Sequence, residues 1–364
     1  MKKRTRGYSR LRWRIGVYMF LGLPLVIVAM LKLRSWDVCD EVKQHQISDP
    51  FKPKLAFLFL ARHFMPLDIL WEHFFEESRE NEFSIYIHAR PGYSYTEENT
   101  MCRFFVDRQL KNPTQVVWGE ATMIQAERLL LTEALKEPLN DRFLLISDSC
   151  IPMYNFEFVY NYVMASEKSF VDSFIDYSDK QYNDDMKAVI PHENWRKGSQ
   201  WFTLTRKHAE AVAADSTVFP MFVQYCKKVV LPDNWTSDPV KNGTKMPHNC
   251  IPDEHYIQTL FAMKDLERET ERRTLTYSRW ENHVKNKGRE GWHPVTFTFQ
   301  DSTLETIKYI QAFRNIRYET ESRTEWCKVA GKERPCFLFA RKFTRAAGFR
   351  LLDQVTKYEK AVPS

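Results

Sequence analysis

The sequence predicts an α/β fold with a mostly parallel central sheet, because apolar strands alternate with amphipathic helices through its first half. Residues 55–60 are a continuous apolar run, which is typical of a parallel strand covered on both faces. Residues 66–78 carry Leu, Trp and Phe at helical spacing, and residues 83–88 predict a second strand that ends before Pro91 and Gly92. This order of strand, helix and strand is typical of an open α/β sheet.

The next elements continue the alternation. We expect a short strand at residues 116–118, a helix at 123–137 and a strand at 142–146. A helix at 155–165 should follow, with Asn155 as its N-terminal cap. The second half is less regular, and it predicts four helices and one late strand, at residues 206–214, 219–228, 252–264, 303–313 and 337–339.

A basic tail and an apolar run precede the predicted sheet. Residues 1–14 contain seven Lys and Arg and no acid, and the 17 residues 15–31 carry no charge. That length is about the minimum for a helix that crosses a bilayer at ~1.5 Å per residue. The basic excess favours an N-terminus in the cytosol. We therefore expect a cytosolic tail at 1–14, a transmembrane signal anchor at 15–33, a stem at 34–53 and a lumenal domain at 54–364.

Two alternatives for the apolar run remain open. A cleaved signal peptide would have an apolar core of about 7–15 residues and a cleavage site between small residues. The run is longer than that, and no such site follows it between Lys32 and Trp36. A buried core helix is the other alternative, although it would rarely be apolar on every face.

The charge distribution argues against nucleic-acid binding. The chain has a formal net charge of +6, but residues 1–34 supply nine of its 53 Lys and Arg and none of its 47 Asp and Glu. Residues 35–364 therefore carry 44 basic and 47 acidic side chains. A domain without a basic excess lacks the main electrostatic attraction to phosphate backbones.

Seven cysteines and two glycosylation sequences fit a domain in the oxidising secretory lumen. No C-x-x-C pair is present, so neither a zinc site nor a thioredoxin-like site is expected. Cys327 and Cys336 are close enough in sequence to pair, and Cys39 could be free or could link two chains into a dimer. Asn234 and Asn242 are the glycosylation acceptors. Together with the anchor, these features predict a single-pass type II glycoprotein of the Golgi membrane.

No common catalytic motif is present. The sequence lacks G-x-G-x-x-G, the P-loop, G-x-S-x-G and H-E-x-x-H. It also lacks D-x-D, the carboxylate pair with which many lumenal sugar transferases hold a divalent metal on a nucleotide diphosphate. A diphosphate bound to this chain would therefore need Arg or Lys to neutralise it, and no metal cofactor is expected.

The strongest carboxylate cluster is Asp253 and Glu254, which follow Pro252 at the expected start of a helix. Acids at that position often only complement the helix dipole. Alternatively, one of them is a general base at a domain cleft. Two basic segments between aromatic residues, 195–201 and 279–294, leave a similar choice between a solvated turn and a binding loop.

Five segments carry a resemblance to a known family. They are FLLISDSCIP at 143–152, GSQWF at 198–202, PDEH at 252–255, Trp280, and FLFARKF at 337–343. In this order they resemble the core-2/I-branching β-1,6-N-acetylglucosaminyltransferase family, and most closely its plant branch. The resemblance covers roughly residues 54–350. It implies a GT-A-like nucleotide-sugar-binding fold and inverting, metal-independent transfer from a UDP-sugar donor to a hydroxyl of a glycan or glycoprotein.

The resemblance also implies roles for individual residues. Glu254 matches the catalytic base, and Lys342 matches the lysine that holds the diphosphate, with Arg341 beside it. Arg334 is a second candidate for the family's other basic residue. N-acetylglucosamine is the expected donor sugar. Another donor, such as UDP-glucuronic acid or UDP-xylose, and a non-catalytic carbohydrate-binding homologue remain as alternatives.

On the donor side, the resemblance places Ala61, Arg62 and His63 in the nucleotide loop after the first strand, and Asp148 in the loop after the fourth. His88 stands where the animal enzymes carry an acid near the ribose, and Trp118 stands where they carry a tyrosine.

On the acceptor side, Trp280 matches a tryptophan of the family. Asn282 replaces a second aromatic residue, so the acceptor specificity of the animal enzymes does not carry over.

Overall fold

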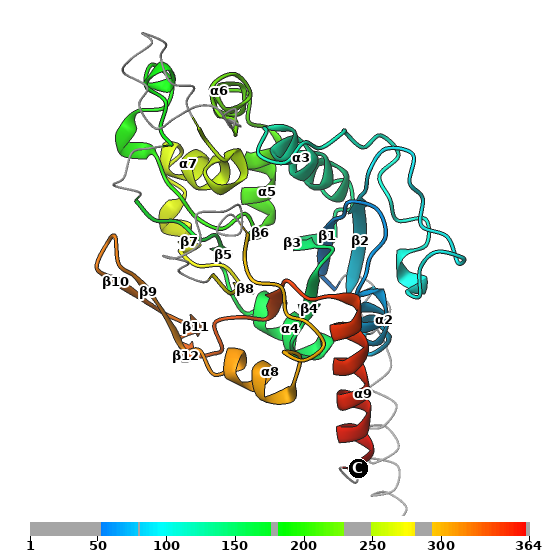
Figure 1. The fold of residues 1–364 in the computed structure, drawn as a ribbon. Helices are drawn as coiled ribbons and strands as arrows, with labels where there is room; N and C mark the ends of the chain where they lie inside the picture. The colour runs from blue at the N-terminus through cyan, green and yellow to red at the C-terminus, as the bar shows by residue number, and fades with distance from the viewer. Residues whose placement is uncertain (1–51, 79–80, 176–180, 229–248, 281–292, 362–364) are drawn as a thin grey trace, which may run out of the picture. The chain divides into compact units, whose positions relative to one another are not determined.

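A six-stranded sheet in the order β2-β1-β3-β6-β5-β7 forms the centre of the fold (Figure 1). The computed structural model describes residues 52–361 except 79–80, 176–180, 229–248 and 281–292. The strands are β1 Lys54–Leu60, β2 Phe83–His88, β3 Asn140–Ser147, β5 Ser169–Phe170, β6 Thr203–Thr205 and β7 Thr270–Glu271. β1 pairs in parallel with β2 and β3, β5 pairs in parallel with β7, and β6 runs antiparallel to β3 and β5. The predicted α/β fold with a mostly parallel sheet is therefore confirmed.

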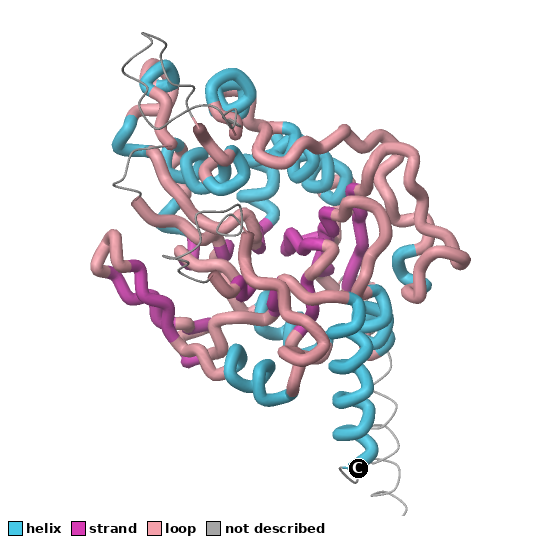
Figure 2. The backbone as a smooth tube through the Cα atoms, viewed as in Figure 1, coloured by secondary structure: helices cyan, strands magenta, loops and turns pink. Residues whose placement is uncertain are grey.

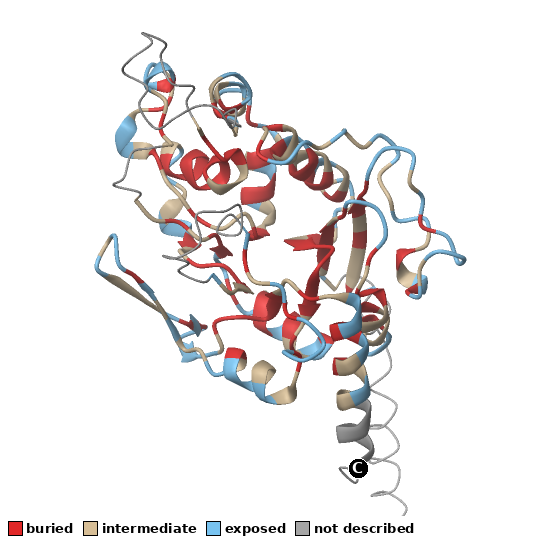
Figure 3. Cartoon of the chain, viewed as in Figure 1, coloured by how far each residue is buried: buried red, intermediate tan, exposed pale blue. Residues whose placement is uncertain are grey.

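Alternate residues of β1 fill two cores, one on each face of the sheet. Leu55, Phe57 and Phe59 belong to one core, and Ala56 and Leu58 belong to the other. Both faces are buried, as Figure 3 shows for the central strands, which is why β1 is apolar throughout.

Helices cover both cores (Figure 2). The first core receives side chains from α2 Asp68–Glu76, α4 Phe156–Met164, α8 Leu304–Gln311 and α9 Arg345–Ala361. The second receives them from α3 Thr122–Ala134, α5 Arg206–Ala213, α6 Val218–Tyr225 and α7 Tyr256–Met263. Asn155 caps α4 as predicted, because its side chain accepts a hydrogen bond from the backbone N–H of Phe158 at 3.0 Å.

A second, three-stranded sheet brings the C-terminal part of the chain to the end of β3. Its order is β4 Cys150–Pro152, β13 Phe339–Arg341 and β8 Thr276–Ser278. β13 runs antiparallel to β4 and parallel to β8. The N–H of Phe343 donates to the carbonyl of Ser149 at 3.0 Å, and Trp71 on α2 donates its Nε1–H to the carbonyl of Cys150 at 3.0 Å. These bonds fix the small sheet against the large one.

Two hairpins complete the described residues. They are β9 Asn315–Tyr318 with β10 Arg323–Trp326, and β11 Lys328–Val329 with β12 Lys332–Glu333. The β9–β10 hairpin is fastened to the segment after β5, because the Tyr318 hydroxyl donates to Asp172 and Arg323 Nη2 donates to the carbonyl of Ser173 at 3.0 Å.

The strand predicted at residues 116–118 is wrong. This segment is a loop, and its apolar side chains do not face a core, since Val117 and Trp118 are exposed. The hydroxyl of Thr122 accepts the N–H of Val117 at 2.9 Å, and Gly119 then turns the chain with φ +80°. A β-branched and aromatic composition favours a strand, but here side-chain contacts replace backbone pairing.

Two other boundaries differ from the prediction. The helix expected at 252–264 divides into a 3₁₀ turn, Pro252–Glu254, and helix α7, because His255 between them has a non-helical φ of −131°. The late strand expected at 337–339 is two residues further on, so that Arg341 ends the strand and Lys342 follows it.

The predictions for the cysteines are tested in part. Cys327 and Cys336 form a disulfide as predicted, and Cys226 pairs with Cys250. Cys102 and Cys150 are free and buried.

Several predicted features lie outside the described residues. They are Cys39, Asn234, Asn242, the tail, the expected anchor at 15–33 and most of the stem. Within the described part of the chain, no helix combines the length and the apolar character that crossing a membrane requires.

The two disulfides should stabilise the fold to different extents. Their sequence separations are 24 for Cys226–Cys250 and 9 for Cys327–Cys336. The longer loop loses more freedom in the unfolded chain, which corresponds to ~3.5 against ~2.7 kcal/mol. Replacing Cys226 and Cys250 by Ala should therefore lower the free energy of unfolding more than the same change at Cys327 and Cys336. Denaturant titrations measure both, and the reverse order would contradict the loop argument.

Candidate active site

The ends of β1 and β3 are joined by an ion pair at the carboxyl edge of the sheet. Arg62 follows β1 and Asp148 follows β3, and the Arg62 Nε atom donates to Asp148 Oδ2 at 3.0 Å. Carboxyl ends of parallel strands meet at one edge, so residues far apart in sequence become neighbours there. The Arg62 side chain is otherwise largely exposed. The structure thus brings these two predicted donor-side residues together.

The other residues of the first loop have different environments. Ala61 is buried, and its N–H donates to the carbonyl of His88 at 2.9 Å, which extends the pairing of β1 with β2. His63 is exposed and its ring stacks on Phe64 with 5.0 Å between centroids.

His88 supports the loop before α3 and is not open to solvent. Its side chain is buried, and Nε2 accepts the backbone N–H of Thr114 at 3.1 Å. Burial lowers the pKa of His88 to about 4, so the ring is neutral and can act as this acceptor. The structure therefore places His88 against the loop that carries Trp118, and its role toward a ligand stays a prediction.

Trp118 lies within a group of cations. The Nζ atom of Lys228 is 3.7 Å from the Trp118 ring centroid, and the His293 ring is 5.0 Å away. Burial and then the charges of Lys342, Lys228 and Arg341 lower the pKa of His293. His293 therefore connects two predicted residues, because its ring contacts Trp118 and it interacts electrostatically with Lys342.

Arg341 and Lys342 are adjacent, half-buried cations at the end of β13. Burial, followed by the charges of Arg341 and Arg62, lowers the pKa of Lys342 to about 8. Burial also lowers the pKa of Arg341 to about 10, although Cys150, Asp148 and Asp253 oppose this shift.

The Arg341 guanidinium packs on an aromatic ring, but one of its hydrogen-bond donors has no partner among the described residues. It lies 4.4 Å from the centroid of the Trp201 ring. Its Nε atom is buried and has no hydrogen-bond partner among the described residues. A buried donor without a partner is costly, and it is the kind of group that a bound anion satisfies.

Glu254 is the partly accessible carboxylate of the cluster. Its side chain is 29% exposed, and its Oε2 atom is 3.8 Å from the Nζ atom of Lys197. Burial raises the pKa of Glu254, while Lys197 opposes the shift. The backbone carbonyl of Glu254 accepts the N–H of Gly198 at 2.9 Å. A Cβ atom at Gly198 would lie 1.9 Å from the carbonyl oxygen of Asp172, so only glycine allows this approach.

The carboxyl group of Asp253 is more buried than that of Glu254. Burial and then Glu254 raise the pKa of Asp253 to about 7. Its Oδ1 atom is buried and has no hydrogen-bond partner among the described residues. Burial and then Asp253 raise the pKa of Glu127, a buried residue of α3 whose Oε1 accepts from Gln200 Nε2 at 2.7 Å.

Two further predicted residues, Trp280 and Arg334, follow the strands β8 and β12. Trp280 follows β8, which pairs Ser278 with Arg341, and its side chain is 54% exposed. Arg334 follows β12, donates its N–H to the carbonyl of Cys327 and acts electrostatically on Tyr162, so the structure does not bring it to Lys342. Asn282 lies outside the described residues.

Several site residues were not predicted. Lys197 and Trp201 lie in the segment 195–201, whose basic and aromatic residues were noted in the sequence but were given no specific role. Glu127 and Lys228 gave no signal, since each is a single charge within an amphipathic segment. Within the described ranges, no group of three or more His, Cys, Asp or Glu is arranged to hold a metal ion.

Comparison with known proteins identifies the family. The sequence model described as Core-2/I-Branching enzyme matches residues 55–311. The chain is also 53% identical over 307 residues to Glycosyltransferase BC10 of Oryza sativa subsp. japonica, which covers 84% of this chain and 77% of the rice protein. The resemblance found in the sequence is thus confirmed. The chain belongs to the core-2/I-branching enzyme family, within its plant branch, and is a glycosyltransferase.

Proposed function

We propose that this glycosyltransferase moves a sugar, with N-acetylglucosamine as the expected one, from a UDP-sugar to a hydroxyl of a glycan or glycoprotein, with inversion and without a metal. The observation that supports this most is a series of electrostatic interactions in the candidate site. Glu254 raises the pKa of Asp253, and Asp253 in turn acts on Arg341, which precedes Lys342.

The reaction needs a base and an anion site. The acceptor hydroxyl attacks the anomeric carbon from the face opposite UDP, while the bond from that carbon to the phosphate oxygen breaks. Glu254 takes the hydroxyl proton as the new bond forms. Arg341 and Lys342 stabilise the charge that grows on the leaving diphosphate, as preorganised cations do in other transferases.

Two buried atoms without hydrogen-bond partners among the described residues suit the proposed substrates. Arg341 Nε is a donor that suits a phosphate oxygen, and Asp253 Oδ1 is an acceptor that suits a hydroxyl group. Trp118 and Arg62 flank the same region and suit the nucleotide. UDP-glucuronic acid and UDP-xylose are the alternative donors, and a screen of UDP-sugar hydrolysis by the full-length protein distinguishes them.

Glu254→Gln should lower turnover at least ~10²-fold, because a general base contributes on the order of 10²–10⁴ in rate. The affinity for UDP should change little, since other residues hold the nucleotide. Asp253→Asn is the matched control. Because the pKa of Asp253 is about 7, its neutral form resembles Asn, and the effect on turnover should be smaller. Steady-state kinetics on variants with unchanged thermal melting measure both. Normal turnover of Glu254→Gln would place the base elsewhere.

Lys342 should make UDP binding depend on pH. Its pKa of about 8 means that it loses its charge above that pH. A bound diphosphate favours the charged form, so the affinity for UDP should fall as pH rises through about 8. Lys342→Met should weaken binding below pH 8 and remove this dependence, whereas Lys136→Met, an exposed lysine after α3, should do neither. Calorimetric titrations with EDTA present test this. A need for manganese would contradict the role of the cations.

The location of the protein is a further part of the proposal. We propose a single-pass type II protein of the Golgi membrane, with glycans at Asn234 and Asn242. The basic tail and apolar run of the sequence support it, and so do the two disulfides, which are typical of an oxidising compartment. In intact microsomes, protease should leave residues 54–364 undigested until detergent is added. Digestion without detergent would refute this topology.

A further inference from the structure

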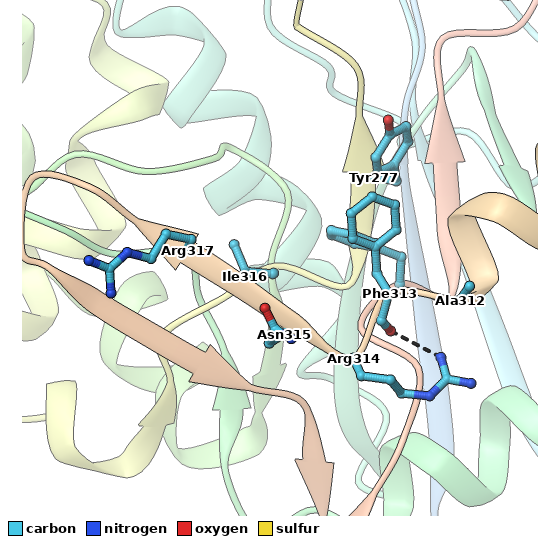
Figure 4. Close-up of a pocket in the computed structure, with 8 residues that line it drawn as sticks. Tyr277, Ala312, Phe313, Arg314, Asn315, Ile316 and Arg317 are labelled. Atoms are coloured by element: carbon cyan, nitrogen blue, oxygen red, sulfur yellow. Dashed lines mark hydrogen bonds between the residues drawn. The ribbon is translucent and has the colours of Figure 1, made fainter.

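Two hollows lie side by side along β8, α8 and the start of β9. Their volumes are about 510 and 320 Å³, and both are lined by Tyr277. Neither is lined by Glu254, Asp253 or Lys342, so they are distinct from the candidate active site. We call them together the aromatic groove. In Figure 4, Tyr277 lies beside Phe313, and β9 leads from there to Arg317.

Aromatic rings form the floor of the groove. Phe313 is 5.9 Å from Tyr277 and 5.3 Å from Tyr309, measured between ring centroids. Tyr309 is 63% exposed, so its ring is available to a ligand. Rings that are apolar on their faces and polar at one end suit ligands that are themselves amphipathic, and pyranose sugars present an apolar C–H face of this kind.

The charges along the groove are largely balanced. Arg314 Nε is 3.7 Å from Glu333, and Arg317 Nε is 3.5 Å from Glu319. The guanidiniums are also held by backbone carbonyls, since Arg314 Nη1 donates to Gln311 at 2.6 Å and Arg317 Nη1 donates to Ser322 at 2.9 Å. This balance favours a neutral ligand over a polyanion, because Arg314 and Arg317 already face carboxylates.

One end of the groove adjoins the strand that carries the diphosphate cations. Phe297 lines the smaller hollow, and its N–H donates to the carbonyl of Lys342 at 2.7 Å. Arg279 lines the same hollow and lies 5.2 Å from the Phe297 ring centroid, while the preceding Ser278 pairs with Arg341. The smaller hollow therefore adjoins the strands β8 and β13, which lead to Arg341 and Lys342.

We propose that the aromatic groove binds a neutral oligosaccharide segment of the acceptor, several sugars away from the hydroxyl that is glycosylated. This inference rests on the proposed transfer to a glycan. The groove would give the enzyme a preference for extended acceptors, because contacts distant from the reacting hydroxyl add binding energy.

The test measures glycan binding without catalysis. Full-length protein in detergent is titrated calorimetrically with neutral β-1,4-linked hexasaccharides of glucose, galactose and xylose, and with hexagalacturonate as the acidic comparison. Tyr309→Ala and Arg317→Ala should each weaken the best neutral ligand by ~10-fold, about 1.4 kcal/mol. Trp326→Ala is the matched control, since Trp326 is a 55% exposed aromatic on β10 that lines neither hollow. UDP affinity should be unchanged in all three variants.

The outcomes separate this inference from the proposed function. Loss of hexasaccharide binding in Tyr309→Ala with normal UDP affinity supports the groove, even if no transfer reaction is found. Absence of binding by every neutral hexasaccharide, equal binding by Tyr309→Ala and wild type, or tighter binding of hexagalacturonate overturns it. A transferase whose activity is the same on short and long acceptors also overturns it.

Discussion

The burial of two adjacent cations, Arg341 and Lys342, is the constraint on which the candidate site depends. Removal from water destabilises a charged group, so burial lowers the pKa of both side chains, and the charge of Arg341 lowers the pKa of Lys342 further. Asp148 and Asp253 offset only part of this cost, and Asp148 is shared with Arg62. Three cations, Arg62, Arg341 and Lys342, therefore lie near two acids, Asp148 and Asp253. Such an excess of positive charge is unfavourable for folding, but it suits the diphosphate of the donor that we propose.

The two sheets explain how these charges meet. Arg62 and Asp148 come from the carboxyl edge of the large sheet, whereas Arg341 comes from a strand inserted between β4 and β8 nearly 200 residues later. β4 begins two residues after Asp148, so the antiparallel pairing of β13 with β4 fixes the distance between the acid and the cations. The bond from Phe343 to Ser149 secures the same junction beyond the strand. Backbone pairing, more than side-chain attraction, holds the cations in place.

The sequence predicted the parts of the fold with long, regular patterns. β1, β2, β3 and the helices packed on them could be found because burial on both faces leaves a continuous apolar run or a helical stripe. The strands of two or three residues, β4, β8 and β12, contain too few side chains to show a period. Residues 116–118 have strand composition but depend on the bond of Val117 to Thr122, and the preceding Thr114 depends on His88, which is distant in sequence.

The candidate site could also be predicted only in part, because some of its contacts join segments that are distant in sequence. Glu254 and Lys342 were found through the family resemblance, but composition alone could not distinguish Glu254 from Asp253. The structure distinguishes them by environment. Glu254 is partly exposed and faces Lys197, while Asp253 acts electrostatically on the buried Glu127 of α3, more than 120 residues away in sequence. Burial raises the pKa of both carboxyl groups, but their charged neighbours differ. Another segment holds Glu254, because Lys197 faces its carboxylate and the N–H of Gly198 donates to its backbone carbonyl. The contact between the segments 197–198 and 253–254 therefore positions the proposed base.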